Sequence, residues 1–300
     1  MAVNVLLPVF LVVGVGWLLG RSLRLDPDPL AKLTFWILSP ALIFESLRTA
    51  QLPLEHYGIV TAFVVAHYGG MYLVSLPLRR LLFPDNPAAQ AAASLTLVFG
   101  NCGNLGLPIL MFAFGQPGFD VGVVFLAANT VLLATLGVAI ASREPGDSWR
   151  GALGNLVRVP WPYAVAAAAL SRLLWPLPEW LARATGLLSQ GAIPALLLLL
   201  GLQLARIRPR EVARDAAWLA GLRLSLASLL AWGLAVAFGA QGVMRGSLVV
   251  EGSVPSAVNS FLLAAQFDRR PDLAAAALLL STVLSLGTLS LTLFLLGPGG

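Results

Sequence analysis

The sequence predicts an all-α membrane protein of ten transmembrane helices, built as two inverted repeats of five helices each. Hydrophobic residues make up 58% of the 300 residues and charged residues only 11%, whereas soluble domains average about 25% charged residues. The apolar residues form successive runs of a length that can span a bilayer, which takes about 20 residues. Two of these runs are interrupted by glycine, proline and asparagine, and they occupy corresponding places in the two halves.

The first five predicted spans are separated by short polar connections. Arg21 and Arg24 close the first span, Asp26 is a helix N-cap before the second, and the pair Arg79 and Arg80 closes the third. A turn at Gln116-Pro-Gly separates the fourth from the fifth. The predicted spans are Val3–Gly20, Leu30–Leu47, Tyr57–Leu78, an interrupted run with half-helices Ala88–Phe99 and Pro108–Gly115, and Val121–Ala141.

The second five spans follow a polar segment that is too short to be a domain, Arg143–Arg158. A basic loop, Arg206–Asp215, separates two of these spans. They are predicted at Val159–Trp175, Leu181–Ala205, Ala216–Phe238, an interrupted run over Gly246–Phe267, and Leu273–Leu296. We therefore divide the chain into a first repeat over residues 1–142, a cytoplasmic linker over 143–158, and a second repeat over 159–300.

The two halves resemble each other in layout. Pro40-Ala-Leu-Ile-Phe in the second span matches Pro194-Ala-Leu-Leu-Leu in the seventh, 154 positions later. A repeat of five spans crosses the membrane an odd number of times, so the second copy must insert upside down. Inverted repeats with broken helices in equivalent places are a common design of secondary transporters.

The basic residues give the orientation. Fourteen of the 19 lysines and arginines lie in the loops that follow odd-numbered spans, four lie on the opposite side, and Arg223 lies inside a span. By the positive-inside rule the odd-numbered loops are cytoplasmic, so both termini are expected outside a multi-pass protein of the cell (inner) membrane. The net charge of +5 is no sign of nucleic-acid binding, because the arginines flank apolar runs.

Gly100-Asn-Cys-Gly-Asn-Leu-Gly-Leu-Pro108 interrupts the fourth span. Three glycines, two asparagines and a proline make a poor helix interior. Unwound backbone is tolerated at membrane depth only where protein buries it or where it lines a wet cavity. The stretch is therefore predicted to be unwound, and a broken helix of this kind indicates a transporter's binding site.

Glu251-Gly-Ser-Val-Pro-Ser-Ala-Val-Asn259 interrupts the ninth span at the equivalent place. Helix N-termini favour an anionic group, so two facing breaks suit a small carboxylate better than a sugar or a peptide. Mid-span polar residues elsewhere, including Ser281, could line the same cavity. The candidate substrate-binding residues are Asn101, Asn104, Gly106, Pro108, Asn129, Thr130, Pro255, Ser256, Asn259 and Thr282.

Ionisable residues inside spans are costly and are candidates for function. Glu251, together with Ser253, is a candidate for ion coupling through sodium or a proton; the alternatives are a neutral structural acid or a partner of Arg245. Arg223 either extends to the membrane surface or contacts a substrate or counter-ion. His67 is either a packing residue or a proton relay.

Two other features do not point to transport chemistry. Glu45 and Arg48 are expected to form an i,i+3 pair near the membrane interface. The single cysteine, Cys102, excludes an intrachain disulfide and gives no metal-site spacing, so no cofactor or metal is expected beyond a coupling ion.

The two breaks carry a family resemblance. Asn101-x-Gly-Asn-x-Gly-x-Pro108 and Val254-Pro-Ser-Ala-Val-Asn259 resemble the auxin efflux carrier family, which includes plant PIN-type exporters and bacterial permeases. The resemblance implies ten helices in two inverted repeats, with the fourth and ninth crossing. It also implies a scaffold of helices 1, 2, 6 and 7, a moving transport domain of helices 3–5 and 8–10, and a homodimer.

A second resemblance concerns the stretch that begins at Glu251. Glu251-Gly-Ser-Val-Pro-Ser256 is similar to the Glu-x-Gly-x-Gln-Asn stretch of bile acid:sodium symporters, which share the fold and whose glutamate helps to bind sodium. This chain has Pro255 where that pattern has glutamine.

The sequence therefore predicts a secondary transporter that moves a small organic anion, auxin-like or a dicarboxylate, by elevator-like alternating access. The alternative on the same fold is a sodium-coupled organic anion symporter. An intramembrane enzyme would need a nucleophile with its base, a metal cluster or paired acids, which two histidines, one cysteine and isolated carboxylates do not supply. A receptor or a scaffold protein would not need two breaks at repeat-related positions.

Overall fold

The computed structural model describes residues 2–50, 52–142, 160–173, 177–207 and 212–297. Within these ranges the chain is helical, and the one β-type contact is an isolated antiparallel bridge between Gly100 and Ser256. This confirms the all-α prediction. The predicted linker over 143–158, and Arg208 and Arg210 of the predicted basic loop, lie outside the described residues.

The helices follow the predicted spans closely, except at the two interrupted runs. Three short stretches, labelled η, are wider π-helical turns. The elements are α1 (Ala2–Ser22), α2 (Pro27–Leu33), η1 (Thr34–Leu38), α3 (Ser39–Thr49), α4 (Leu54–Leu82), α5 (Pro87–Val98), η2 (Cys102–Gly106), α6 (Leu107–Leu132), η3 (Leu133–Gly137), α7 (Val138–Ala141), α9 (Trp161–Leu173), α10 (Glu179–Arg206), α11 (Ala213–Ala237), α12 (Gly242–Ser253), α13 (Val258–Gln266) and α14 (Pro271–Leu296).

Seven helical stretches among the described residues are long and apolar enough to cross a membrane. They correspond to α1, the run from α2 to α3, α4, the run from η2 to α7, α10, α11 and α14. The shorter helices α5, α9, α12 and α13 have 12, 13, 12 and 9 residues, fewer than the ~20 that a complete span needs. A count of ten spans therefore stays a prediction, in which α12 and α13 together make one crossing.

The residues before α2 and α5 start these helices as their sequences predict. Asp26 accepts a hydrogen bond from the amide of Asp28 at 3.2 Å, and Pro27 occupies the first turn, where its missing N–H costs nothing. Asn86 likewise accepts from the amide of Ala89 at 2.9 Å. The predicted pair of Glu45 and Arg48 is confirmed, with a 2.5 Å contact within α3.

The run from η2 to α7 turns back on itself at Gly115. Its 40 residues would extend about 60 Å as one straight helix, twice the thickness of the hydrocarbon core. Gly115 has φ of 63° and ψ of −155°, a conformation that glycine adopts at little cost. A side chain at Gly122 would contact Leu110 at 2.6 Å and Leu107 at 2.8 Å, which a straight helix would place ~18 Å or more from it. The chain reverses direction between the predicted fourth and fifth spans, but it does so at Gly115 and not at the predicted turn Gln116-Pro-Gly, whose residues are helical.

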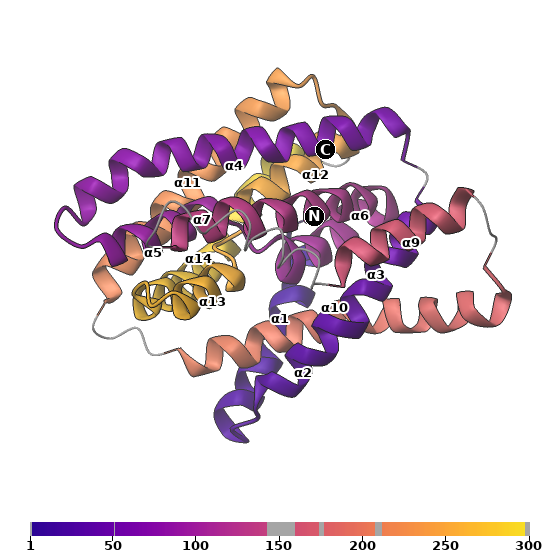
Figure 1. The fold of residues 1–300 in the computed structure, drawn as a ribbon, viewed down its shortest axis with the longest axis horizontal. Helices are drawn as coiled ribbons and strands as arrows, with labels where there is room; N and C mark the ends of the chain where they lie inside the picture. Colours follow the sequence, from indigo (N-terminus) through magenta and orange to yellow (C-terminus); the bar gives the residue numbers. More distant parts are fainter. Residues whose placement is uncertain (1, 51, 143–159, 174–176, 208–211, 298–300) are drawn as a thin grey trace.

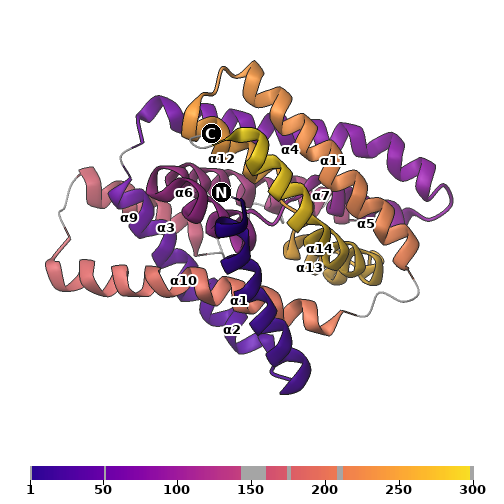
Figure 2. The ribbon, with the colours of Figure 1, turned by 180° about the vertical axis from the view of Figure 1, so that it is seen from behind.

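The helices pack in two groups. In Figure 1, α4 and α11 run along one side of the molecule, with α5, α12, α13 and α14 packed beneath them. On the opposite side α10 packs against α1 and α3, and α3 packs against α9. Figure 2 shows the same separation from behind. Helix α6 packs against α4 and α12 and so belongs, with η2, to the first group. The groups meet where α10 contacts η2, where α1 and α3 contact α6, and where α1 contacts α14, so the first predicted break lies at the boundary between them.

Candidate functional site

The first break is shorter than predicted. Helix α5 ends at Val98, Phe99 is extended with φ of −94° and ψ of 128°, and η2 begins at Cys102. The amides of Leu105 and Gly106 both donate to the carbonyl of Asn101 at 3.1 Å, so the helix restarts at once as a wide turn. The prediction that the backbone between Phe99 and Pro108 is unwound is therefore wrong from Cys102 onward, because the wider turn accommodates the glycines of this stretch.

The second break is also narrower than predicted. Helix α12 continues to Ser253, and α13 begins at Val258. Glu251 therefore lies in the last turn of α12 and does not begin the break. Pro255 explains the position of the interruption, because it lacks an amide hydrogen and disfavours a helical conformation at Val254. Val254 accordingly has φ of −63° and ψ of 153°.

The two breaks are joined to each other by backbone hydrogen bonds. The amide of Asn101 donates to the carbonyl of Pro255 at 2.8 Å, and the amide of Ala257 donates to the carbonyl of Phe99 at 3.0 Å. The hydroxyl of Ser256 adds a bond to the carbonyl of Thr96 at 3.1 Å. Segments about 150 residues apart in the sequence thus satisfy each other's backbone groups, as buried polar backbone requires.

Arg223 of α11 lies behind these breaks and is fully buried. Its guanidinium donates to carbonyls of both breaks, including those of Val98 at 2.9 Å and Val254 at 3.1 Å. The alternative in which its side chain reaches the membrane surface is therefore wrong.

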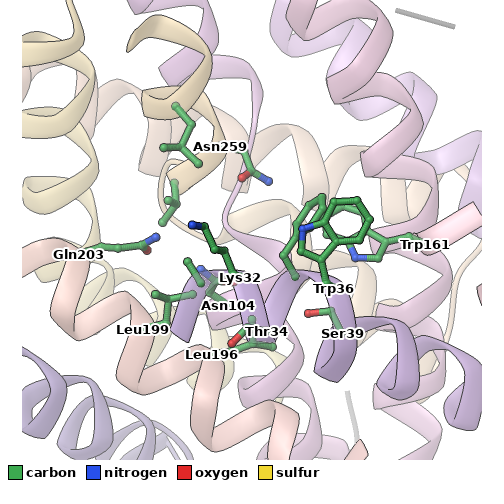
Figure 3. A pocket seen from close by; sticks show the side chains of 14 residues that line it. Lys32, Thr34, Trp36, Ser39, Asn104, Trp161, Leu196, Leu199, Gln203 and Asn259 are labelled. Atoms are coloured by element: carbon green, nitrogen blue, oxygen red, sulfur yellow. The ribbon is translucent and has the colours of Figure 1, made fainter. Parts of the chain in front are cut away.

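A cavity of about 280 Å³ lies between the two helix groups, in front of the breaks. Asn104 from η2 and Asn259 from α13 line one side, and Lys32 from α2 and Gln203 from α10 line the other. Figure 3 shows these four side chains directed into the same space, with Trp36 and Trp161 beside them. A smaller space of about 60 Å³ shares part of this lining, including Asn104 and Asn259, and is also lined by Asn101 of the first break and Asn129 of α6.

Polar atoms around this cavity lack hydrogen-bond partners within the described part of the chain. They are Thr34 Oγ1, Gln203 Oε1, Trp161 Nε1, Asn101 Nδ2 and Asn129 Oδ1. Buried polar atoms are normally paired. The lining therefore offers donors and acceptors to a small polar ligand, with the Lys32 ammonium adding a positive charge.

The structure brings together only some of the predicted substrate residues. The two adjoining spaces are lined by four of them: Asn101, Asn104, Asn129 and Asn259. The hydroxyls of Thr130 and Thr282 instead bond within their own helices, to the carbonyls of Leu126 at 2.8 Å and Leu278 at 2.7 Å. Gly106, Pro108, Pro255 and Ser256 are buried and do not line either space.

Sequence reasoning missed the side of the cavity that faces the breaks. The cavity residues on this side come from predicted spans 2, 6 and 7, which contain no break and were therefore not predicted to bind substrate. They are Lys32, Trp36, Trp161 and Gln203. One signal was present: Lys32 is the single lysine among the 19 lysines and arginines of the chain.

The predicted ion-coupling residues lie deeper. Glu251 and Ser253 are fully buried, and their side-chain oxygens lack hydrogen-bond partners among the described residues. His67, the candidate packing residue or proton relay, is also fully buried and lies beside Gly252. Glu251 packs against the backbone of Gly106 and Gly122, where a side chain would collide with its carboxyl group. The alternative of a Glu251–Arg245 pair is therefore not what the structure forms.

Comparison with known proteins places the chain in a family. A family model described as "Membrane transport protein" matches residues 1–148 and 153–294. An "Uncharacterized transporter" of Methanothermobacter thermautotrophicus is 28% identical over 95% of each chain. A "Putative malonate transporter" of Rhizobium meliloti is 27% identical over 99% of this chain and 96% of its own. A further "Uncharacterized transporter", of Methanocaldococcus jannaschii, is 24% identical over 96% of each chain. With several apolar helices around paired breaks and a family match over nearly its whole length, the chain is a multi-pass membrane transporter, not an enzyme, and belongs to the membrane transport protein family, that of the auxin efflux carriers.

Proposed function

We propose that this transporter moves a small organic anion with one or two carboxylate groups. The anion binds in the cavity that lies between the two helix breaks on one side and helices α2 and α10 on the other. The observation that carries this proposal is the lining itself. Asn104 and Asn259 come from the two breaks, and the Lys32 ammonium faces them across the cavity.

The chemistry of the lining favours a carboxylate over a neutral solute. Lys32 offers a full positive charge, and Trp161 Nε1 and Asn101 Nδ2 are N–H donors without partners among the described residues. A sugar would need no ammonium group. The relative from Rhizobium meliloti is named a putative malonate transporter, and a dicarboxylate of that size is compatible with a cavity of about 280 Å³.

The proposed mechanism is alternating access by an elevator-like motion. In this mechanism the group that contains α4, α5, η2, α6, α7 and α11 to α14, which covers predicted spans 3–5 and 8–10, moves against the group that contains α1, α2, α3, α9 and α10, which covers spans 1, 2, 6 and 7. The cavity lies at the boundary between them, so such a motion would expose it to each side of the membrane in turn. We further propose ten crossings in two inverted repeats with the broken helices crossing, a homodimer, and both termini outside the cell.

A second candidate function is sodium-coupled symport of the organic anion. The unpartnered, fully buried carboxyl of Glu251 favours it, because a buried carboxylate is stable only with a counter-charge or after protonation. Under this alternative Glu251 and Ser253 would hold sodium; otherwise the same carboxyl would carry a proton.

Uptake by the purified protein in proteoliposomes tests the proposal. Radiolabelled malonate should enter saturably above empty liposomes, and other mono- and dicarboxylates should compete with it. Uptake that depends on a sodium gradient would favour the symport alternative. If no carboxylate is transported or competes, while neutral solutes are transported, the anion assignment fails.

A further inference from the structure

Arg223 is a full charge in the interior of the molecule, and its surroundings define what it does. Its side chain extends from the middle of α11 and is fully buried. A charge at such a place is tolerated only when it is paired or hydrogen-bonded. The hydrogen bonds of Arg223 run to backbone carbonyls, and among the described residues no carboxylate forms a salt bridge with it.

These carbonyls belong to the C-terminal ends of two half-helices. Nη1 donates to Leu97 and Val98, the last residues of α5, at 2.9 Å each. Nε and Nη2 donate to Val254, which follows α12, at 3.2 and 3.1 Å, and Nη2 also lies 3.4 Å from the carbonyl of Gly252. One guanidinium therefore caps both helix ends.

Two helix C-termini that meet inside a protein create a need for a cation. The last carbonyls of a helix lack intrahelical partners, and the helix end carries a partial negative charge. In transporters with broken helices, such carbonyl ends are where sodium or a proton is bound. Here the same carbonyls are bonded to a side chain of the protein.

We propose that the guanidinium of Arg223 is a resident counter-cation that takes the place of a dissociable metal cation between the ends of α5 and α12. The two breaks then keep their arrangement without sodium, and the position is closed to an exchangeable ion. The proposal deepens the proposed function by describing how its binding site is held together. It rests on the proposed function only in measurements of transport, and not in the alkylation test below.

Gly100 fits this role. A side chain at position 100 would lie 2.5 Å from Nη2 of Arg223 and 2.8 Å from Val254, so only glycine lets the guanidinium reach both helix ends. Arginine also suits the position better than lysine, because its planar fork has five donors and remains charged in proteins. A lysine has three donors on a point charge and cannot reach carbonyls on both sides equally.

The single cysteine provides a test that needs no substrate. Cys102 is buried and directly follows the first break, so its alkylation by N-ethylmaleimide in detergent-solubilised protein reports opening of that break. The wild-type rate should be slow and equal in sodium chloride and choline chloride. In the Arg223→Ala variant Cys102 should be alkylated at least about tenfold faster, because the charge-assisted hydrogen bonds are lost. Dilute guanidinium chloride should slow the alkylation of Cys102 in this variant, whereas tetramethylammonium chloride should not. The alkylation rate in Arg223→Lys should lie between those of the wild type and Arg223→Ala.

Arg172→Ala is the matched control. Its guanidinium also donates to a backbone carbonyl, that of Leu47 at 3.1 Å, but between α9 and α3. This variant should alkylate as the wild type does, with no response to guanidinium. A merely structural role for Arg223 would give faster alkylation without rescue by guanidinium, and that result overturns the proposal, as does wild-type protection that requires sodium.

Gly100→Ala provides a second variant if Arg223→Ala fails to fold. It should displace the guanidinium and speed alkylation of Cys102, whereas Gly103→Ala, whose added carbon meets Leu126 at an ordinary 3.4 Å, should not. Equal rates in the two glycine variants would contradict the role of Arg223. Because alkylation is measured without substrate, a failure to transport carboxylates would affect the proposed function alone.

Discussion

At the scale of single residues, Lys32 gives the cavity its positive charge. It lies on the exposed side of α2, and no ion pair of Lys32 is found within the described ranges. An exposed ammonium that no carboxylate neutralises is available to an incoming anion. The asparagines opposite it are neutral and would orient the ligand without deciding its charge.

Replacing Lys32 therefore tests the charge of the substrate. Lys32→Gln should raise the KM for carboxylate uptake by roughly 10- to 100-fold, the equivalent of one hydrogen bond to a charged group, and Lys32→Arg should keep part of the affinity.

Asn104→Ala and Asn259→Ala should also weaken uptake. Arg183→Gln, which removes an exposed charge paired with Glu179, is the control, and a Lys32→Gln protein with wild-type KM would place the anion elsewhere.

Glu251 is the residue that we propose couples transport to a proton or to sodium. Glu251→Gln keeps the shape of the side chain and mimics the protonated acid. Under proton coupling the variant should lose the pH dependence of uptake while exchange of substrate persists. Under sodium coupling it should lose the sodium dependence and much of the uptake. We expect the first result, because Arg223 already holds the carbonyls that a sodium ion would need.

The control for this substitution is Glu179→Gln, at an exposed acid paired only with Arg183. It should leave both dependences unchanged. A well-folded Glu251→Gln protein whose ion and pH profiles match the wild type would exclude a coupling role and favour a uniporter driven by the membrane potential.

At the scale of helices, the sequence predicted the positions of the two helix breaks but not their lengths. Glycine, asparagine and proline mark both interruptions, and local propensity is sufficient to find them. The ends of α5 and α12 depend instead on partners distant in the sequence. Ser260 donates to the carbonyl of Leu95 at 2.9 Å and Arg223 to that of Val98 at 2.9 Å. Such long-range capping leaves no periodic signal, and for the same reason the α2 and α10 side of the cavity was not predicted.

The capping of α5 by another helix predicts a measurable stability effect. Ser260→Ala should leave the carbonyl of Leu95 with one partner fewer in a buried place, at a cost of about 1 kcal/mol, and should lower the Tm of the purified protein. Ser290→Ala, whose hydroxyl bonds to Leu286 within its own exposed turn of α14, should leave the Tm nearly unchanged. Equal Tm values for the two variants would show that the cross-helix bond contributes nothing.

At the scale of the whole molecule, an inverted repeat determines which connections between helices face the same side of the membrane. The pairing of two breaks about 150 residues apart is the geometry that an inverted repeat produces. The asymmetry of the arginines predicts the orientation independently of the breaks. An inverted repeat would put the connection between α4 and α5 and the connection between α11 and α12 on opposite sides of the membrane. The positive-inside rule then predicts that the connection between α4 and α5 is the cytoplasmic one.

Labelling from each side of the membrane tests this arrangement. In a Cys102→Ser background, a cysteine at Asp85, an exposed residue between α4 and α5, should react with a membrane-impermeant maleimide only after the cells are opened. A cysteine at Gln241, exposed between α11 and α12, should react in intact cells. The two positions lie at opposite ends of the α4 and α11 layer if the second repeat is inserted upside down. Labelling of both from the same side would contradict the inverted repeat, and labelling with the sides exchanged would keep the repeat and reverse the orientation.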